Sequence, residues 1–131
     1  MPKTIIRTDR AAAPVKNAYS QATSSGPFIF TAGQVALDPQ GQLVGKGDIT
    51  RQTEQVLENI KAILAAAGAS MEDVLKTTVF IARVEDYPAM NEVYFRYFPN
   101  PASRPARSTL VAQMVLPDLL VEIEAVAARG E

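Results

Sequence analysis

Two segments near the C-terminus carry the residue types best suited to chemistry. Arg107 lies near the start of one predicted strand, within residues 104–109, and Glu122 and Glu124 lie in the middle of the next, within residues 120–127. A planar guanidinium can grip a carboxylate through two parallel hydrogen bonds, and a carboxylate can orient a water and move its proton. If the two strands are neighbours across the turn between them, both groups reach one site. We predict that this guanidinium and carboxylate carry out the chemistry of the protein.

The predicted strand at 120–127 has one apolar face and one mixed face, because side chains alternate along a strand. The apolar face, which we expect in the core, is formed by Val121, Ile123, Ala125 and Ala127. The mixed face carries Leu120, Glu122, Glu124 and Val126. An unpaired charge is costly to bury, and large aliphatic side chains are uncommon on a plain solvent face. We therefore expect another subunit to cover the mixed face, leaving a cleft where a charge is useful.

Composition limits the classes of function. The 131 residues fit one domain, 1–131, with a single core. The net charge of −1, without a basic cluster, does not favour nucleic acid or an anionic membrane as a partner. The chain has no Cys and no His, which excludes thiol nucleophiles, Ser-His pairs and imidazole ligands. No ladder of Asp and Asn has the spacing of a carboxylate metal site, so we expect neither a metal nor a cofactor.

Two further absences concern location. No apolar stretch is long enough to span a bilayer, and residues 1–7 lack the apolar run of a signal peptide. These features predict a cytoplasmic protein.

The order of elements predicts an α/β (α+β) fold. We expect short strands at 4–7, 17–22 and 28–32, with a turn at 24–27. A helix capped by Asp48 or Thr50 and ending at Gly68 follows, and then a strand at 74–82. A second helix begins at Asp86, with Pro88 in its first turn, and precedes the two strands described above. Two helices can cover only one face of the resulting mixed sheet. The other face should be covered in a closed symmetric assembly.

Some residues allow more than one interpretation. Gly33, directly after the strand at 28–32, marks a bulge or a close backbone approach to a ligand, or is simply tolerated near a strand end. The apolar side of the second helix is expected to include Tyr87, Met90, Tyr94, Phe95 and Phe98. Arg107 could instead be a surface residue or part of a structural ion pair, and Glu124 could pair with a cation of a neighbouring subunit.

The chain resembles the reactive intermediate deaminase (RidA) family, the small enamine/imine deaminases, essentially from end to end. The segments that carry the resemblance are 17–22, 30–35, 64–68, 74–80, 86–94, 105–109 and 121–127. Their occurrence in this order is a specific signal. The resemblance implies a chorismate-mutase-like fold, with a mixed six-stranded sheet and two helices on one face. It also implies a homotrimer with a cleft at each of three subunit interfaces.

The resemblance also implies roles for individual residues. By family position, Arg107 grips a substrate carboxylate and Glu122 is associated with the hydrolytic water. Positions that match pocket-lining residues of the family are Tyr19, Gly33, Asn91 and Thr109. The chain departs from the family pattern at Asn17-Ala18, at Ala32 and at Arg104, so the resemblance implies the reaction class but does not fix the size or type of substrate. Arg104 could add a second contact to an anion.

These residues suggest the hydrolysis of a 2-imino acid such as 2-iminopropanoate or 2-iminobutanoate. Arg107 would hold the carboxylate next to the electrophilic C=N, and Glu122 would orient the water that adds to the carbon. The Tyr19 hydroxyl and backbone groups near Gly33 could hold the nitrogen. Loss of ammonia from the carbinolamine leaves a 2-oxo acid. The alternatives are a related catabolic deaminase acting on an aminomuconate- or aminoacrylate-type substrate, and a non-catalytic trimer that binds small carboxylates or protein clients.

Overall fold

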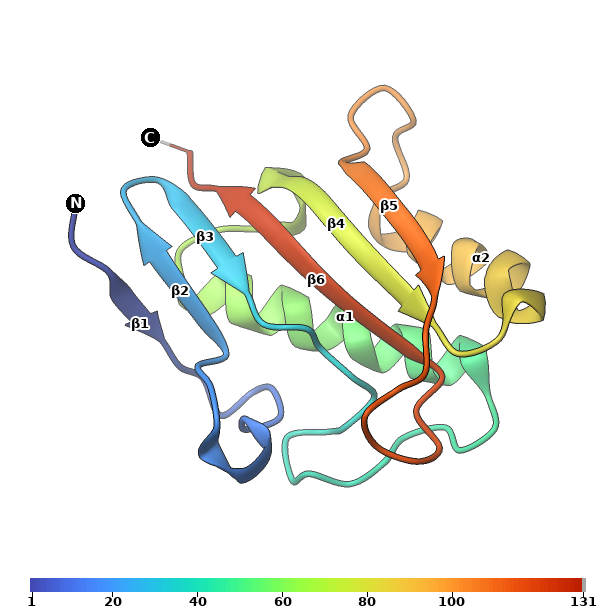
Figure 1. Cartoon of the computed structure of the whole chain (residues 1–131). Helices are drawn as coiled ribbons and strands as arrows, with labels where there is room; N and C mark the ends of the chain where they lie inside the picture. Colours follow the sequence, from blue (N-terminus) through green and yellow to red (C-terminus); the bar gives the residue numbers. More distant parts are fainter. Residues whose placement is uncertain (131) are drawn as a thin grey trace.

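A six-stranded mixed sheet with two helices on one face forms the protein in a computed structural model that describes residues 1–130 (Figure 1). The strands are β1 (Thr4–Ile6), β2 (Ala22–Ser25), β3 (Phe28–Thr31), β4 (Val74–Ile81), β5 (Ala106–Val111) and β6 (Val121–Ala128). Their order in the sheet is β1-β2-β3-β6-β4-β5. Strands β4 and β5 are parallel, and the other neighbouring pairs are antiparallel.

The two helices are α1 (Ile49–Ala66) and α2 (Tyr87–Tyr97), and both lie on the same side of the sheet (Figure 1). The Asp48 side chain caps α1 by accepting a hydrogen bond from the Arg51 backbone N–H, at 3.2 Å. The predicted apolar stripe of α1 is buried and is formed by Val56, Ile60, Ile63, Leu64 and Ala67. Pro88 lies in the first turn of α2, where its missing N–H is harmless. The mixed sheet and its helical face are therefore as predicted.

Strand β6 lies at the centre of the fold, between β3 and β4. Its predicted apolar face, formed by Val121, Ile123, Ala125 and Ala127, is buried beneath α1. Leu120 departs from the predicted alternation. It precedes β6 and is buried in the core, because its backbone N–H donates to the side chain of the buried Gln52 at 2.8 Å.

The segment before the first hairpin differs from the prediction. Residues 17–22 do not form a strand: one 3₁₀ turn covers Val15–Asn17, and β2 begins only at Ala22. The cause is the buried side chain of Gln21, which accepts a hydrogen bond from the Thr8 N–H and donates to backbone carbonyls of the N-terminal loop. These bonds hold the preceding segment as a loop. The hairpin turn is correspondingly shorter than the predicted 24–27, since Ser25 still pairs with Phe28.

The predicted adjacency of the Arg107 and Glu122 strands is wrong. Strand β4 lies between β5 and β6: Arg107 pairs with Thr77, and Thr77 pairs with Ala125 on β6. Thr77 and Ala125 both point to the helical side, so Arg107 does too, whereas Glu122 points to the open side. The connection from β5 passes over the end of β4 before β6 begins. Within one chain the two charged side chains therefore lie on opposite sides of the sheet.

The open face of the sheet carries large apolar side chains. The exposed ones on this face include Phe28, Phe30 and Leu110. Phe30 is 49% exposed and pairs across the ladder with Val126, close to the two glutamates of β6. Exposed large apolar side chains on a sheet face that no helix covers are typical of a surface that associates with another copy.

Replacing Phe30 by glutamate should therefore disrupt self-association. If another copy covers the open face, the added charge would be buried there, and burying a charge without a partner is costly. We expect the variant to elute as a smaller species than the wild type in size-exclusion chromatography with light scattering. The control is Val84→Glu, since Val84 is exposed near the start of α2 on the helical side. A wild-type protein that is itself monomeric would contradict the prediction.

Candidate functional site

A bulge after β3 brings the backbone of Gly33 against the side chain of Glu122. Phe30 pairs with Val126, but Gln34 rather than Gly33 pairs with Ile123, so β3 contains one extra residue at this point. The Gln34 N–H donates to the Ile123 carbonyl at 2.8 Å and closes the bulge. A Cβ on Gly33 would overlap the Glu122 carboxylate. The glycine is therefore required for the close approach of the Glu122 side chain, and the bulge is one of the interpretations that the sequence left open.

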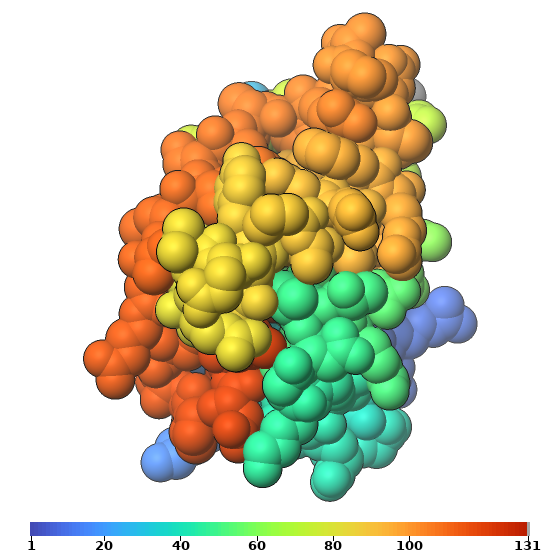
Figure 2. Space-filling view, turned by 90° about the vertical axis from the view of Figure 1, so that its right-hand side faces the viewer, coloured from blue at the N-terminus to red at the C-terminus, as the bar shows by residue number. Residues whose placement is uncertain are grey.

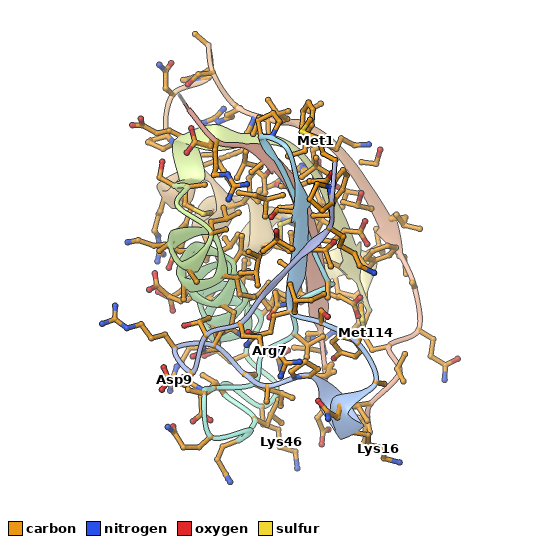
Figure 3. All side chains as sticks on the ribbon, turned by 90° about the vertical axis from the view of Figure 1, so that its left-hand side faces the viewer. Met1, Arg7, Asp9, Lys16, Lys46 and Met114 are labelled. Atoms are coloured by element: carbon orange, nitrogen blue, oxygen red, sulfur yellow. The ribbon has the colours of Figure 1, made fainter. Side chains whose placement is uncertain are left out.

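Glu122 opens into a pocket of about 460 Å³ at one end of the sheet. Three loops line it: the segment around Tyr19, the bulge with Gly33, and the loop between β5 and β6, including Leu116. Figure 3 shows Lys16 and Met114, from the first and third of these loops, at the same end of the molecule. Tyr19 is exposed, and its hydroxyl accepts a hydrogen bond from the Val15 N–H at 3.2 Å. The fold thus brings Tyr19, Gly33 and Glu122 together.

Burial raises the pKa of the Glu122 carboxyl, and the negative charge of nearby Glu124 raises it further. Among the ion pairs of residues 1–130, none involves Glu122. A half-buried carboxylate without a cation is not explained by stability, because a structural role would supply a partner. Its environment instead suits a group that takes up and releases a proton more readily than an exposed glutamate does.

Buried amides position the loops around this pocket. Gln52, fully buried on α1, donates to the carbonyls of Gly45 and Asp118 at 3.1 and 2.8 Å and accepts from the Leu120 N–H. Asn59, also buried on α1, donates to the carbonyls of the segment after Gly33, at Val35 and Leu37. Gln21 holds the N-terminal loop, as described above. Each loop around Glu122 is therefore fixed by a buried amide side chain that is hydrogen-bonded to backbone groups of that loop.

Arg107 belongs to a second cluster, on the helical side of the sheet. Its Nη1 donates to the Asn91 Oδ1 at 2.8 Å and its Nη2 donates to the Tyr87 hydroxyl at 3.0 Å. The guanidinium carbon lies 4.7 Å from the centre of the Tyr94 ring, within the range of a cation–π contact. Residues 87, 91 and 94 follow the i, i+4, i+7 spacing of one helix face. Figure 2 views the molecule from the edge formed by β5 and α2, where the yellow start of α2 lies beside the green α1.

The remaining predicted residues have different surroundings. Thr109 pairs with Val79 and shares the helical side of β5 with Arg107, two residues further along the strand. Arg104, predicted as a possible second anion contact, is used structurally instead: its Nε donates to the Phe98 carbonyl at 2.8 Å, and its guanidinium lies over the Phe95 ring at 4.1 Å. Phe95 is consequently exposed beneath Arg104 rather than in the core, as is Tyr87 beside Arg107.

The predicted site residues thus form two groups in a single chain. Tyr19, Gly33 and Glu122 line the pocket on the open side, whereas Asn91 and Arg107 are hydrogen-bonded on the helical side. Arg107 lies on β5, at the edge of the sheet. Each group contains half of the predicted site. The group on the helical side contains Arg107, the predicted carboxylate-binding cation, and the group on the open side contains Glu122, the predicted acid.

Sequence reasoning missed the hydroxyl of Tyr87, which was assigned only to the apolar side of α2. The signal was present in the spacing, because Tyr87, Asn91 and Tyr94 project polar groups from one helix face.

Residues 1–130 contain no cluster of three or more carboxylates suited to a metal ion. In the same part of the chain, neither helix combines the length and apolar character required to cross a membrane.

Comparisons with known proteins agree with this architecture. A family model described as Endoribonuclease L-PSP matches residues 10–129. A RutC family protein of Pyrococcus abyssi is 47% identical, with 97% of this chain and 98% of the relative covered. The 3-aminoacrylate deaminase RutC of Acinetobacter baylyi is 41% identical over 97% of this chain and 98% of that protein.

The fold is also found among solved structures. That of Escherichia coli TdcF with bound serine superposes with a TM-score of 0.88 and 38% identity, covering 97% of this chain and 99% of that one. Sequence and fold thus match the same group of proteins along nearly the whole chain. This chain belongs to the RidA family, to which the RutC and TdcF proteins are related.

Proposed function

We propose that this protein is a hydrolytic deaminase of reactive 2-enamine and 2-imine acids, such as 2-iminopropanoate and 2-iminobutanoate, and that it releases 2-oxo acids and ammonia. The observation that carries the proposal is the Glu122 carboxylate, which is half-buried in a pocket against Gly33, has a raised pKa and lacks a cationic partner among residues 1–130. Such a group is suited to accept a proton from a water and return it. Relatives named as deaminases support the reaction class.

The proposal requires a second copy of the chain, because Arg107 and Glu122 lie on opposite sides of one sheet. The apolar open face around Phe30 would be covered in a homotrimer, and the exposed edge of β5 would bring Arg107 of one copy to the Glu122 pocket of the next. Each of the three clefts would then contain one guanidinium and one carboxylate.

In such a cleft the reaction proceeds in three steps. Arg107, held by Asn91, binds the substrate carboxylate through two hydrogen bonds and fixes the adjacent imine carbon. Glu122 accepts a proton from the attacking water as the water oxygen bonds to the carbon, and it passes this proton to the imine nitrogen to give a neutral carbinolamine. Glu122 then transfers the proton of the carbinolamine hydroxyl to the amine nitrogen. The C–N bond breaks as the C=O bond forms, and ammonia leaves with a 2-oxo acid as the other product. The Tyr19 hydroxyl and the backbone near Gly33, which line the same pocket as Glu122, would hold the nitrogen.

A catabolic enamine such as 3-aminoacrylate is the second candidate substrate, favoured by the relative of Acinetobacter baylyi that is named for this activity. It also carries a carboxylate conjugated to a nitrogen-bearing carbon, so the same guanidinium and carboxylate would serve. The proposed partner is a small anionic metabolite rather than RNA, because the net charge is −1. A cytoplasmic location remains a prediction.

A trapping assay tests the activity. An amino-acid oxidase generates 2-iminobutanoate in the presence of semicarbazide, which traps the imine as a semicarbazone. The wild-type protein should lower the rate of semicarbazone formation in proportion to its concentration, and heat-denatured protein should not. Preferential turnover of 3-aminoacrylate would select the second candidate. Binding of 2-oxobutanoate without any effect on either compound would identify a non-catalytic carboxylate-binding protein and overturn the proposed activity.

A further inference from the structure

The hydroxyl of Tyr87 lies beside the Arg107 guanidinium at the surface of the protein. The Arg107 Nη2 donates to this hydroxyl at 3.0 Å, so the phenol oxygen is the acceptor and its own proton is not used in that bond. Within residues 1–130, no hydrogen bond uses the proton of the Tyr87 hydroxyl. Tyr87 is 40% exposed, which leaves room for an external group next to both side chains.

The surroundings of the phenol make it a stronger donor. The phenol oxygen accepts a hydrogen bond from Asn91, which lowers the pKa of the Tyr87 hydroxyl, and the positive charge of Arg107 lowers this pKa further. A phenol with a lowered pKa donates a stronger hydrogen bond to an anion. By contrast, the Tyr94 hydroxyl is already bonded to Thr77 at 2.7 Å, and burial raises its pKa. Of these two tyrosines beside Arg107, Tyr87 is the one with a proton to offer to a ligand.

We propose that Tyr87 is a specificity residue, whose O–H donates a hydrogen bond to the carboxylate that Arg107 binds. This inference rests on the proposed function, because it takes the same carboxylate-bearing substrate. The guanidinium and the phenol would together form a carboxylate clamp, defined here as Arg107 and Tyr87 with Asn91 bracing the guanidinium. A carboxylate has enough lone pairs to accept from both groups.

The carboxylate clamp has a consequence for pH dependence. Arg107 on β5 is the charged group that shifts the pKa of the Tyr87 phenol, and Tyr94 on α2 is a titratable group beside the same guanidinium, with its pKa shifted the opposite way. Below its pKa the phenol donates to the substrate. Above its pKa the phenolate pairs with Arg107 and repels the substrate carboxylate. The KM of the wild-type enzyme should therefore rise at alkaline pH, and this rise should be absent from Tyr87→Phe.

The test uses 2-oxobutanoate, the product of the proposed reaction, as a probe of binding. Tyr87→Phe should weaken its binding about tenfold at neutral pH, as expected for the loss of one hydrogen bond to a charged group. The KM for the imine should increase to a similar extent while kcat changes little, because the carboxylate is held equally in the ground and transition states. The matched control is Tyr97→Phe, which removes another hydroxyl of α2, one that donates to Glu58 of α1, and which should leave binding unchanged.

The Arg107→Ala variant distinguishes a direct contact between Tyr87 and the ligand from an effect of Tyr87 on the position of Arg107. In Arg107→Ala, adding Tyr87→Phe should weaken 2-oxobutanoate binding further, as measured by chemical-shift titration at millimolar ligand. If the added change has no effect there, or if Tyr87→Phe alone binds like the wild type, the inference is overturned. These measurements do not depend on turnover. A wild-type protein that binds 2-oxobutanoate but hydrolyses no imine would refute the proposed function and leave the role of Tyr87 testable.

Discussion

Arg107→Ala and Glu122→Gln should each lower imine hydrolysis at least about a hundredfold, and a mixture of the two inactive proteins should recover activity. Removing the guanidinium eliminates the group that orients the substrate, and replacing the carboxylate by an amide eliminates the proton acceptor. Each loss is large because each group is the single one of its kind in the proposed cleft.

Recovery on mixing follows from the position of the two side chains on opposite sides of one sheet. If a cleft takes Arg107 from one copy and Glu122 from the next, every mixed trimer contains one intact cleft. Random mixing of equal amounts should restore about a quarter of the wild-type activity in a cyclic trimer. The variants would be co-expressed with different affinity tags. Doubly tagged oligomers are all mixed, so they should show about a third of the wild-type activity in the semicarbazide trap.

Two results would contradict the shared cleft. Mixed oligomers that remain as inactive as their parents would show that both side chains act within one chain or that neither acts. A fully active Glu122→Gln protein would remove the carboxylate from the mechanism. The control is Glu85→Gln, since Glu85 lies next to α2 and is exposed; oligomers containing this variant should retain wild-type activity.

The pH profile gives an independent check on Glu122. The carboxylate is the active form in the proposed mechanism, so activity is present above its pKa and is lost as the pH falls through it. Because burial and Glu124 raise that pKa, the acidic limb of kcat/KM should lie above the usual range for glutamate. Glu124→Gln should move the limb to lower pH, since it removes a neighbouring negative charge. No movement of the limb would argue that another group controls it.

The sequence was sufficient for features set by local pattern. The period-two alternation of β6 identified its buried face, and the Asp48 cap and the apolar stripe identified α1. These succeeded because side-chain direction within one element follows from backbone geometry alone. Gly33 was also informative, because a glycine directly after a strand suggested a bulge, and the structure confirms the bulge there.

The sequence was insufficient where distant segments decide the outcome. Consecutive strands are often neighbours, but β4 is inserted between β5 and β6, and no local pattern reveals that insertion. The same insertion places Arg107 and Glu122 on opposite sides. Strand 17–22 was mispredicted because the hydrogen bonds of Gln21 to the N-terminal loop are invisible to propensity. The role of Arg104 depends on backbone carbonyls at the end of α2, which are likewise a tertiary feature.

Gln52→Leu should be among the most destabilising single changes in the protein. The Gln52 side chain makes three hydrogen bonds to backbone groups of two loops, and it is fully buried. Leucine has a similar size but leaves the Leu120 N–H and the carbonyls of Gly45 and Asp118 without this partner. Leaving buried polar groups unsatisfied costs about 1–3 kcal/mol each, so a loss of about 3 kcal/mol in the free energy of unfolding is expected.

The measurement is urea unfolding at a fixed protein concentration, because association adds to the apparent stability of an oligomer. Gln42→Leu is the matched control: it is the same substitution at an exposed loop position and should change the free energy of unfolding by less than about 0.5 kcal/mol. The Asp118 and Leu120 contacts of Gln52 fix the loop that enters β6 just before Glu122. Folded Gln52→Leu protein should therefore also have a reduced kcat. A variant as stable as the wild type would show that water replaces the amide, and that the loop is held by its own packing.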